Sequence, residues 1–304
     1  MDKKLQKKWF DADYRIFNLE TPLVNEESPI LKSGPHLSAS KDSINGVNKL
    51  NPSLISMANN HIMDHGNNGL TSTIKLIKKS NLPYVGVGNN LESASKSYII
   101  NEEELKVGVY SCAEHEFTIA TEKKPGANPF DPFESLDHIS ELSKKSDFVI
   151  VLYHGLKEHY RYPTPKVQKA CRKMVDKDAD LILCQHSHCI GSFEEYDSGT
   201  ILYGQGNFIF NMRDNEYWNT GLLVELVIKK DKYNVDYIPF KTNSVGIQSL
   251  NNEEKHEIMD SFNKRSEEIK NQDFVENEYN KFVHKNIDNY LRNMTFFWEM
   301  VIKN

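Results

Sequence analysis

Five segments of the sequence carry polar side chains directly after an apolar run of strand length. They contain, in chain order, Asn18-Leu19-Glu20, Asn59-Asn60-His61, His154-Gly155, His186-Ser187-His188 and Gln205-Gly206-Asn207. In α/β proteins, ligands bind beyond the carboxyl ends of the strands, where the connecting loops converge. One polar strand end is ordinary, but five in one chain predict that these segments form a single site.

The types of these side chains indicate a transition-metal site. Glu20 offers a carboxylate, Asn60 an amide oxygen, and His154, His186 and His188 offer imidazoles. This donor set suits Zn²⁺, Mn²⁺, iron or cobalt, whereas Ca²⁺ prefers ligand shells made only of oxygen. One or two such ions would activate a water molecule as a nucleophile and hold the oxygens of a phosphate or carbonyl group.

Each of these residues also has an ordinary structural interpretation. Glu20 would cap the turn that follows it. Asn59 and Asn60 fit a turn, because asparagine tolerates left-handed backbone and forms Asx turns. His61 and Asp64 fit the start of a helix, where we expect Asp64 mainly to orient the loop or the histidine.

The pair His186 and His188 fits a solvated surface pair as well as a metal site. Cys184 and Cys189 flank the pair and offer a competing structural zinc site, although no second cysteine pair completes a tetrahedral pattern. The four cysteines of the chain are too few and too unevenly spaced for a disulfide framework. The small number and the spacing of the cysteines therefore favour a location of the protein in a reducing compartment.

Length and charge exclude several classes of protein. The 304 residues suffice for a substantial core without crosslinks, and 37 basic against 43 acidic residues give a net charge of −6, which argues against nucleic acid as a partner. No apolar run approaches the about 20 residues of a membrane helix. The charged N-terminus lacks the apolar stretch of a secretory signal. We expect a cytoplasmic protein without a transmembrane segment, or one attached peripherally to the membrane.

Short β-rich runs alternate with helical patterns over about the first 240 residues, which is typical of an α/β sheet. The expected strands are residues 14–18, 54–57, 84–87, 106–111, 148–153, 181–184 and 200–203, and the expected helices are residues 69–80, 135–145 and 165–177. Residues 221–229 and 233–239, separated by Lys230-Asp231-Lys232, have the pattern of a hairpin. We therefore expect a mixed sheet with antiparallel strands near its end.

The last part of the chain has a different composition. Residues 251–304 are first polar and then aromatic, and we expect them to form two or three helices that extend a domain of residues 1–250. Aromatic residues at helical spacing are usually buried, so we expect packing on that domain, with an oligomer contact as the alternative. The aromatic residues are Phe274, Tyr279, Phe282, Tyr290, Phe296, Phe297 and Trp298.

Several separated motifs together carry a family resemblance over about residues 10 to 240. They are Asn18-Leu19-Glu20-Thr21-Pro22-Leu23, Ala58-Asn59-Asn60-His61 with Asp64 and Gly66, His154-Gly155 with Glu158, His186 with His188, and Tyr203-Gly204-Gln205-Gly206-Asn207. In this order they resemble the CapA family of capsule and poly-γ-glutamate synthesis proteins, of the calcineurin-like metallophosphatase superfamily. The resemblance implies an α/β fold, a metallophosphatase-like αββα sandwich of mixed sheets.

The resemblance also implies a role for each matched residue. Glu20 would bridge two metal ions, and Asn60 would supply an amide oxygen. His154 and His186 would complete one metal site, while His188 would reach the other. The catalytic pair would be His61, as general acid or substrate contact, and Asp64. The residues that would form the pocket wall or contact substrate are Asn59, Glu158, Gly206 and Asn207.

The family opens with a strand that ends in Gly-Asp, and its aspartate binds the first metal ion. Residues 9–13 already correspond to the segment just before the Asn-Leu-Glu motif, so we expect this first strand to be missing from the sequence. The first metal site would then keep Glu20 and His188. This departure leaves three alternatives open: a one-metal centre, a weakly bound two-metal centre or an inactive relative.

Two functional hypotheses follow from the resemblance. The first is a metal-dependent hydrolase that uses metal-bound hydroxide to attack a phosphoester or an amide-linked polymer in capsule or poly-γ-glutamate synthesis. The second is a non-catalytic component of the capsule-synthesis machinery that keeps the fold, with or without one metal ion. The sequence leaves the identity of the metal open among manganese, zinc and iron.

Overall fold

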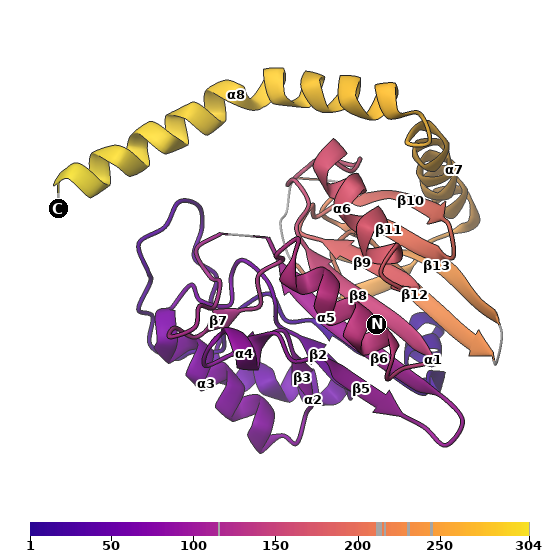
Figure 1. Ribbon diagram of the computed structural model, residues 1–304, viewed down its shortest axis with the longest axis horizontal. Coiled ribbons are helices and arrows are strands. Elements are labelled where there is room, and N and C mark those ends of the chain that lie inside the picture. Colours follow the sequence, from indigo (N-terminus) through magenta and orange to yellow (C-terminus); the bar gives the residue numbers. More distant parts are fainter. Residues whose placement is uncertain (115, 211–214, 216, 230–231, 244–245, 304) are drawn as a thin grey trace.

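The computed structural model describes residues 1–303 apart from 115, 211–214, 216, 230–231 and 244–245 (Figure 1). The side chains of residues 289–290 and 292–303 are also outside the description. The hairpin turn predicted at Lys230-Asp231-Lys232 therefore falls largely outside the described residues, whereas the strands on either side of it are described.

A six-stranded mixed sheet forms the centre of the fold, with the strand order β10-β11-β9-β8-β6-β5. In this order the strands are Ile190–Tyr196, Gly199–Gln205, Leu181–Gln185, Phe148–His154, Lys106–Ala113 and Tyr98–Asn101. The four inner strands run parallel, and β10 and β5 pair antiparallel at the two edges. The parallel strands bring their carboxyl ends to one edge of the sheet, where His154 ends β8 and His186 follows β9.

Helices α5 (Glu134–Ser143) and α6 (Pro165–Val175) cover one face of this sheet. The alternation of side chains along β8 explains the two-sided burial. Val151 and Tyr153 belong to the core under these helices, while Ile150 and Leu152 belong to the core on the opposite face. A strand that is buried on both faces has a continuous apolar sequence, and β8 has such a sequence.

Two three-stranded sheets form the second layer. The parallel sheet contains β1 (Ile16–Asn18), β2 (Leu54–Ser56) and β3 (Tyr84–Val85), and the antiparallel sheet contains β12 (Thr220–Lys229), β13 (Lys232–Asn243) and β14 (Gly246–Ser249). Residues of both sheets share one core with the six-stranded sheet. On the outer side, α2 (Ile44–Leu50) and α3 (Gly66–Lys79) pack on β2. The predicted α/β class and αββα sandwich of mixed sheets are confirmed, with a second layer divided into two sheets.

The predicted runs correspond to β1, β2, β6, β8, β9, β11, β12 and β13 and to α3, α5 and α6, with small differences at their ends. The predicted strand 84–87 is divided into β3 and β4 (Val87–Gly88), and β4 pairs with β7 (Gly126–Ala127). Helix α1 (Lys3–Asp11) was not predicted. Only Leu5 and Trp9 of α1 are buried, four residues apart. The other short elements are η1 (Lys41–Ser43) and α4 (Leu91–Ala94).

The chain ends in two helices, α7 (Asn252–Glu268) and α8 (Gln272–Lys303). α7 packs on β10, where the Arg265 guanidinium donates to the carbonyl of Gly191 at 2.7 Å. At the start of α8, Phe274 packs edge-on against Tyr162, and Phe282 packs against Tyr160. Figure 1 shows that α8 then extends away from the sheets.

The aromatic residues of the C-terminal segment therefore divide into two groups. The first part of α8 packs on the sheet domain, in agreement with the predicted contact of Phe274, Tyr279 and Phe282. The side chains of Tyr290, Phe296, Phe297 and Trp298 lie outside the described residues. Among the helices that the structure describes, none has the length and apolar character needed to cross a bilayer.

Candidate metal centre

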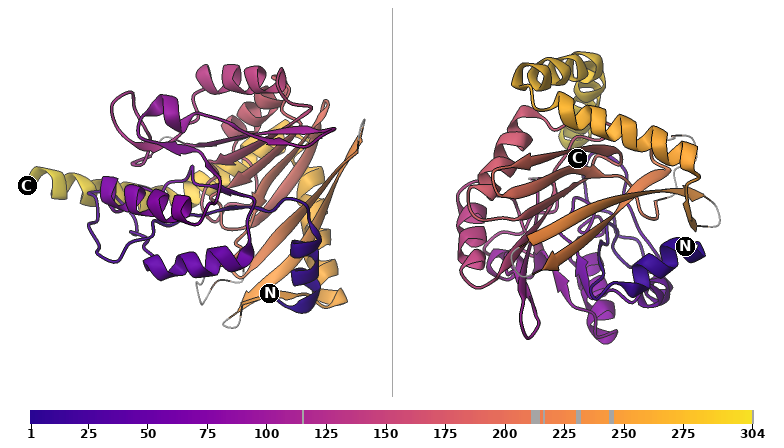
Figure 2. Two further views of the ribbon diagram at one scale, coloured as in Figure 1. Left: turned by 90° about the horizontal axis from the view of Figure 1, so that it is seen from below. Right: turned by 90° about the vertical axis from the view of Figure 1, so that its right-hand side faces the viewer.

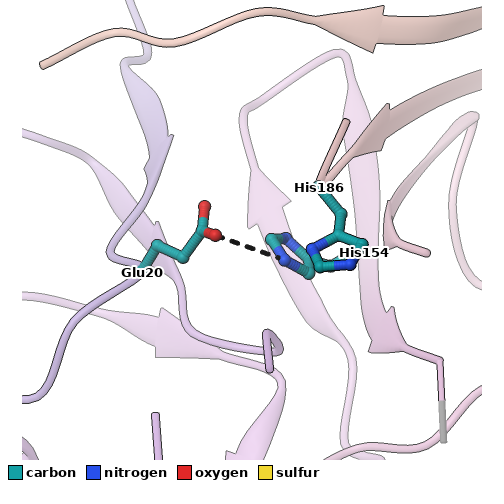
Figure 3. A group of neighbouring side chains, drawn as sticks. All are labelled: Glu20, His154 and His186. Atoms are coloured by element: carbon teal, nitrogen blue, oxygen red, sulfur yellow. Dashed lines mark ion pairs between the residues drawn. The ribbon is translucent and has the colours of Figure 1, made fainter. Parts of the chain in front are cut away.

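Three segments meet at the carboxyl edge of the strands and bring Glu20, His154 and His186 together (Figure 3). Glu20 follows β1, His154 is the last residue of β8, and His186 follows β9. The His154 Nε2 atom lies 3.5 Å from Glu20 Oε1, and the rings of His154 and His186 are 5.0 Å apart between centroids. One ligand atom from each residue lies within 4.8 Å of the others, close enough to hold a metal ion.

The other two predicted ligands lie at the same site. Asn60 Oδ1 is 3.0 Å from His154 Nε2, and His188 Nε2 is 3.8 Å from Glu20 Oε1. Glu20 Oε1 is therefore near a ring nitrogen of both His154 and His188. The structure brings all five predicted metal ligands together.

The polar atoms of this cluster fit a bound cation. Glu20 Oε1, His154 Nδ1 and His186 Nδ1 are buried and have no hydrogen-bond partner among the described residues. Leaving such an atom without a partner costs about 1–3 kcal/mol. Ligands that bind one ion at about 2.1 Å lie about 3–3.5 Å from one another, and the separations in the cluster are close to this. The residues present thus fit a divalent transition metal.

Burial sets the protonation of the cluster. It lowers the pKa of His186 to about 3 and the pKa of His154 well below its ordinary value. Burial, with repulsion from Glu158 and Asp64, raises the pKa of Glu20 to about 8. Neutral imidazoles are the form that binds metals. A cation beside Glu20 would stabilise its ionised form and offset the cost of burial.

Further carboxylates surround His186. Glu114 Oε1 and Glu116 Oε1 lie 3.8 Å and 3.9 Å from His186 Nε2. Glu158, predicted as a substrate contact, is exposed and forms a second group of possible ligands with His186 and His188. Glu114 was not predicted as a site residue, although Glu114 directly follows the buried strand β6 and obeys the same strand-end rule as the five segments.

His61 lies in a separate hydrogen-bonded group with Asp64 and Lys32. The His61 Nδ1 atom is 2.7 Å from Asp64 Oδ2, and the Lys32 ammonium contacts both residues. Burial alone would raise the pKa of Asp64, but hydrogen bonds from His61 and Lys32 outweigh it and lower the pKa. Lys32 was not predicted, because it lies outside any helix or strand and no local pattern marks it as buried.

Three of the predicted substrate-binding residues support the loops of the site. Asn59 is fully buried, and its side-chain amide donates to Asn18 Oδ1 and the Leu19 carbonyl and accepts from the His61 N–H. Asn207 Oδ1 is 2.8 Å from Nδ1 of His188. Gly206 has φ +71°, and a Cβ atom there would meet the Thr220 carbonyl oxygen at 2.5 Å, so only glycine fits the turn.

The backbone at the histidine pair is held in a rare conformation. His186 has φ +91° and His188 has φ +56°, values that non-glycine residues seldom adopt. The ring of His188 stacks on Trp218, with 4.2 Å between centroids. Such conformations persist where the surroundings fix them, and they cluster at functional sites.

The competing zinc site at Cys184 and Cys189 finds no support in the geometry. Both thiols are buried, and Cys184 Sγ lies 3.6 Å from Cys171 Sγ inside the helix-facing core. Over the part of the chain that is described, each group of possible metal ligands consists of glutamate and histidine alone.

Comparisons with known proteins agree with the motifs. The chain is 32% identical over 210 residues to the capsule biosynthesis protein CapA of Bacillus anthracis, covering 66% of this chain and 51% of that protein. It is 31% identical over 208 residues to the PGA biosynthesis protein CapA of Bacillus subtilis (strain 168), covering 66% of this chain and 54% of that protein. The chain thus spans about half the length of the curated relatives it matches.

Among solved structures, the chain resembles a hypothetical protein from Thermus thermophilus, with a TM-score of 0.51, 15% identity, and coverage of 78% of this chain and 91% of that chain. This likeness shows a shared fold. A novel phosphatase of Mycoplasma pneumoniae superposes with a TM-score of 0.45 and 14% identity, covering 82% and 84% of the two chains.

The family assignment rests on the match to a family model. The model of the bacterial capsule synthesis protein PGA_cap matches residues 3–212, well over half of the 304 residues. This range contains Glu20, Asn60, His154, His186 and His188. The chain therefore belongs to the PGA_cap family of bacterial capsule synthesis proteins.

Proposed function

We propose that the protein is a metal-dependent hydrolase of the phosphoesterase type that acts in the synthesis of a capsule or of poly-γ-glutamate. The observation that carries this proposal is the cluster of Glu20, His154 and His186, in which one ligand atom of each residue lies within 4.8 Å of the others. In the same cluster, Glu20 Oε1 and the Nδ1 atoms of both histidines are buried without hydrogen-bond partners among the described residues. A purely structural cluster would satisfy these atoms within the protein, because buried polar groups normally have partners.

Five residues would hold the metal: Glu20, Asn60, His154, His186 and His188. A divalent manganese, zinc or iron ion bound there would supply Lewis-acid chemistry and lower the pKa of a water molecule. Glu20 Oε1 is close to both His154 and His188, which supports its role as the carboxylate shared by two ions. The acidic residues around His186 add negative potential that favours a cation.

His61 would act on the leaving group as a general acid, oriented by Asp64. The Asp64 carboxylate holds the Nδ1 side of the imidazole and leaves Nε2 to carry and donate a proton. Hydrogen bonds from His61 and Lys32 lower the pKa of Asp64, which keeps this carboxylate ionised at neutral pH. We assign Glu158 to the substrate rim because it is exposed next to the cluster.

The biological context comes from the family and from the two CapA relatives, which are described as capsule and PGA biosynthesis proteins. We propose that residues 1–250 form the hydrolase domain and residues 251–304 a helical extension. The substrate would be a phosphoester or a polymer. The protein would act together with the capsule-synthesis machinery.

The test combines metal analysis with turnover. The purified protein is treated with a chelator, dialysed, and assayed with bis(4-nitrophenyl) phosphate while Mn²⁺, Zn²⁺ or Fe²⁺ is added back. We expect stoichiometric binding of at least one ion and hydrolysis that depends on it. A protein that binds metal without turnover on phosphodiester, phosphomonoester and γ-glutamyl substrates would instead be a non-catalytic assembly component. Absence of both metal and turnover would reject the site as well.

A further inference from the structure

Two carboxylates beside the candidate metal centre are not among its five proposed ligands. Glu114 Oε1 and Glu116 Oε1 lie 3.8 Å and 3.9 Å from Nε2 of His186. These separations are too long for hydrogen bonds, but two ligands that bind one ion at about 2.1 Å can be up to about 4.2 Å apart. One ligand atom from each of the three residues lies within 4.8 Å of the others. Glu114 and Glu116, here called the outer carboxylates, are therefore close enough to His186 to share a cation with it.

Hydrogen bonds hold the outer carboxylates in this position. Glu114 directly follows β6, and its main-chain N–H donates to the His154 carbonyl at 2.9 Å. Burial raises the pKa of Glu116, and a hydrogen bond from the Asn60 side chain partly offsets this effect. The two carboxylates are thus connected to two of the residues that would bind the metal.

The polar atoms of His186 and Glu114 distinguish this group from an ordinary acidic surface. The His186 side chain is only 5% exposed, and its Nδ1 atom has no hydrogen-bond partner among the described residues. Glu114 Oε1 is also buried without a partner in the described part of the chain. Buried polar atoms normally have partners. Both atoms therefore fit a site that a bound cation completes.

The surroundings of the outer carboxylates are acidic. Glu158 is exposed next to them and forms a further group of possible ligands with the histidine pair. Lys157 Nζ lies 3.8 Å from Glu114 Oε1, so one ammonium group stands against three carboxylates. Burial raises the pKa of Glu114, Lys157 opposes this effect, and Glu116 and Glu158 add to it. A cation that binds here relieves the repulsion between the carboxylates.

Exposure to solvent decreases from the outer carboxylates to the inner ligands. The side chains of Glu116 and Glu114 are 30% and 23% exposed, whereas those of His186 and His154 are 5% and 1% exposed. His186 belongs both to the group with the outer carboxylates and to the group with Glu20 and His154. Figure 2 shows how the layers that carry these segments lie against each other. An ion at His186 can therefore exchange an open set of ligands for a buried one.

We propose, on the basis of the metal centre in the proposed function, that the outer carboxylates are a loading site for the divalent cation. They capture the hydrated ion from solvent and transfer it by way of His186 to Glu20 and His154. Each carboxylate oxygen that binds replaces one water ligand, so the ion does not lose its water in a single step. A cleft of one charge sign raises the association rate of an oppositely charged ligand by about 10- to 10³-fold. The outer carboxylates therefore set the rate of metal exchange more than the final affinity.

The rates of metal loading and release test this proposal. Metal-free protein is mixed with Mn²⁺ in a stopped-flow instrument, and the fluorescence of Trp218, which stacks on His188, reports the arrival of the ion. We expect the double variant Glu114→Gln, Glu116→Gln to load about ten-fold more slowly at low salt. Release of the ion to a chelator should slow by a similar factor, because the same site lies on the way out. The equilibrium affinity should stay close to that of wild type.

Two further double variants keep the test specific. Glu103→Gln, Glu104→Gln makes the same change in net charge in the exposed segment before β6, at the opposite end of this strand from Glu114, and should load at the wild-type rate. Glu114→Asp, Glu116→Asp keeps both charges but shortens each side chain by one methylene group, and it should also slow loading and release. Wild-type rates in the aspartate variant would show that the negative potential alone acts, and would overturn direct transfer to His186.

Equilibrium binding separates a failure of the loading site from a failure of the metal centre. Unchanged loading and release in the glutamine variant would overturn the loading site, because the outer carboxylates would then be uninvolved. Faster release with weaker binding would also overturn it, because they would then be permanent ligands. In both cases the metal centre itself would stand. A wild-type protein that binds no Mn²⁺ would overturn the loading site and the metal centre together.

Discussion

The two histidine environments of the site differ in how their polar atoms are satisfied. His61 is held by protein neighbours, because Asp64 and Lys32 contact Nδ1 and the Asn59 side chain accepts from its main-chain N–H. His154 and His186 are equally buried, yet each keeps an Nδ1 atom without a protein partner among the described residues. The first arrangement holds one proton in place, and the second leaves room for a ligand that the protein does not itself provide.

This difference corresponds to the two tasks of the proposed metal-dependent hydrolase. A general acid needs a fixed tautomer and a neighbour that stabilises its charged form. Metal ligands need to be neutral and unprotonated, which burial ensures for His154 and His186. Single substitutions can change one environment at a time.

The largest expected effect is on turnover when the acid is removed. His61→Ala should reduce the rate of phosphodiester hydrolysis about 10²- to 10⁴-fold, because general acid catalysis contributes about that much, and metal content should remain at the wild-type level. Metal analysis and kinetics on one preparation check this. Loss of metal together with rate would place His61 among the ligands instead.

Removing the Lys32 ammonium, which contacts both His61 and Asp64, should destabilise the folded protein. Lys32→Met leaves the Asp64 carboxylate buried without its cation and should reduce the free energy of unfolding by about 3 kcal/mol at neutral pH. Both side chains of this pair are almost fully buried, at 3% and 0% exposure. Lys8→Met, at the exposed ion pair with Glu225, is the matched control and should cost less than about 1 kcal/mol. Urea unfolding measures the change in the free energy of unfolding for both variants.

The loss of stability in Lys32→Met should also depend on pH, and the direction of this dependence follows from the pKa of Asp64. Its pKa is lowered in the folded protein, so its stabilisation is present above the unfolded pKa of about 3.9 and is lost as the pH falls through the folded pKa. The difference between wild type and Lys32→Met should therefore be largest at neutral pH and shrink below about pH 4. A difference that stays constant down to pH 3 would show that packing, not charge, explains the loss.

The smallest expected effect concerns the orientation of a ligand. Asn207→Ala removes the hydrogen bond to Nδ1 of His188 and should weaken metal affinity about ten-fold, within the range for residues that orient metal ligands. Asn207→Asp restores an acceptor and should recover most of the affinity. Competition with a chromogenic chelator measures both variants. Full affinity in the alanine variant would show that the stacking on Trp218 alone positions His188.

Much of the site could be predicted because its residues follow buried strands. The strand-end rule found Glu20, Asn60, His154 and the histidine pair, since parallel strands bring their ends to one edge regardless of their distance in the chain. The same rule extends to Glu114. Lys32 could not be found in this way, because its partners are fixed by tertiary folding and no periodicity marks a residue outside regular elements.

The fold shows the same division between local pattern and tertiary context. Strands buried on both faces, such as β8, and the amphipathic helix α6 could be predicted from their apolar patterns. Helix α1 was missed, because a stretch of mostly charged residues carries only Leu5 and Trp9 as buried positions. The break in the second layer was also beyond prediction, because the pairing partners of β1 and β12 depend on topology rather than on their own sequences.

The measurement that tests the central claim most directly is calorimetric titration of the metal-free protein with Mn²⁺. Wild type, His154→Ala, His61→Ala and the surface control His256→Ala are titrated under one set of conditions. We expect His154→Ala to lose at least about 100-fold in affinity, more than residues outside the ligand shell typically contribute, while the other two variants bind like wild type. Equal binding by His154→Ala and wild type would contradict the account, because the metal would then lie elsewhere.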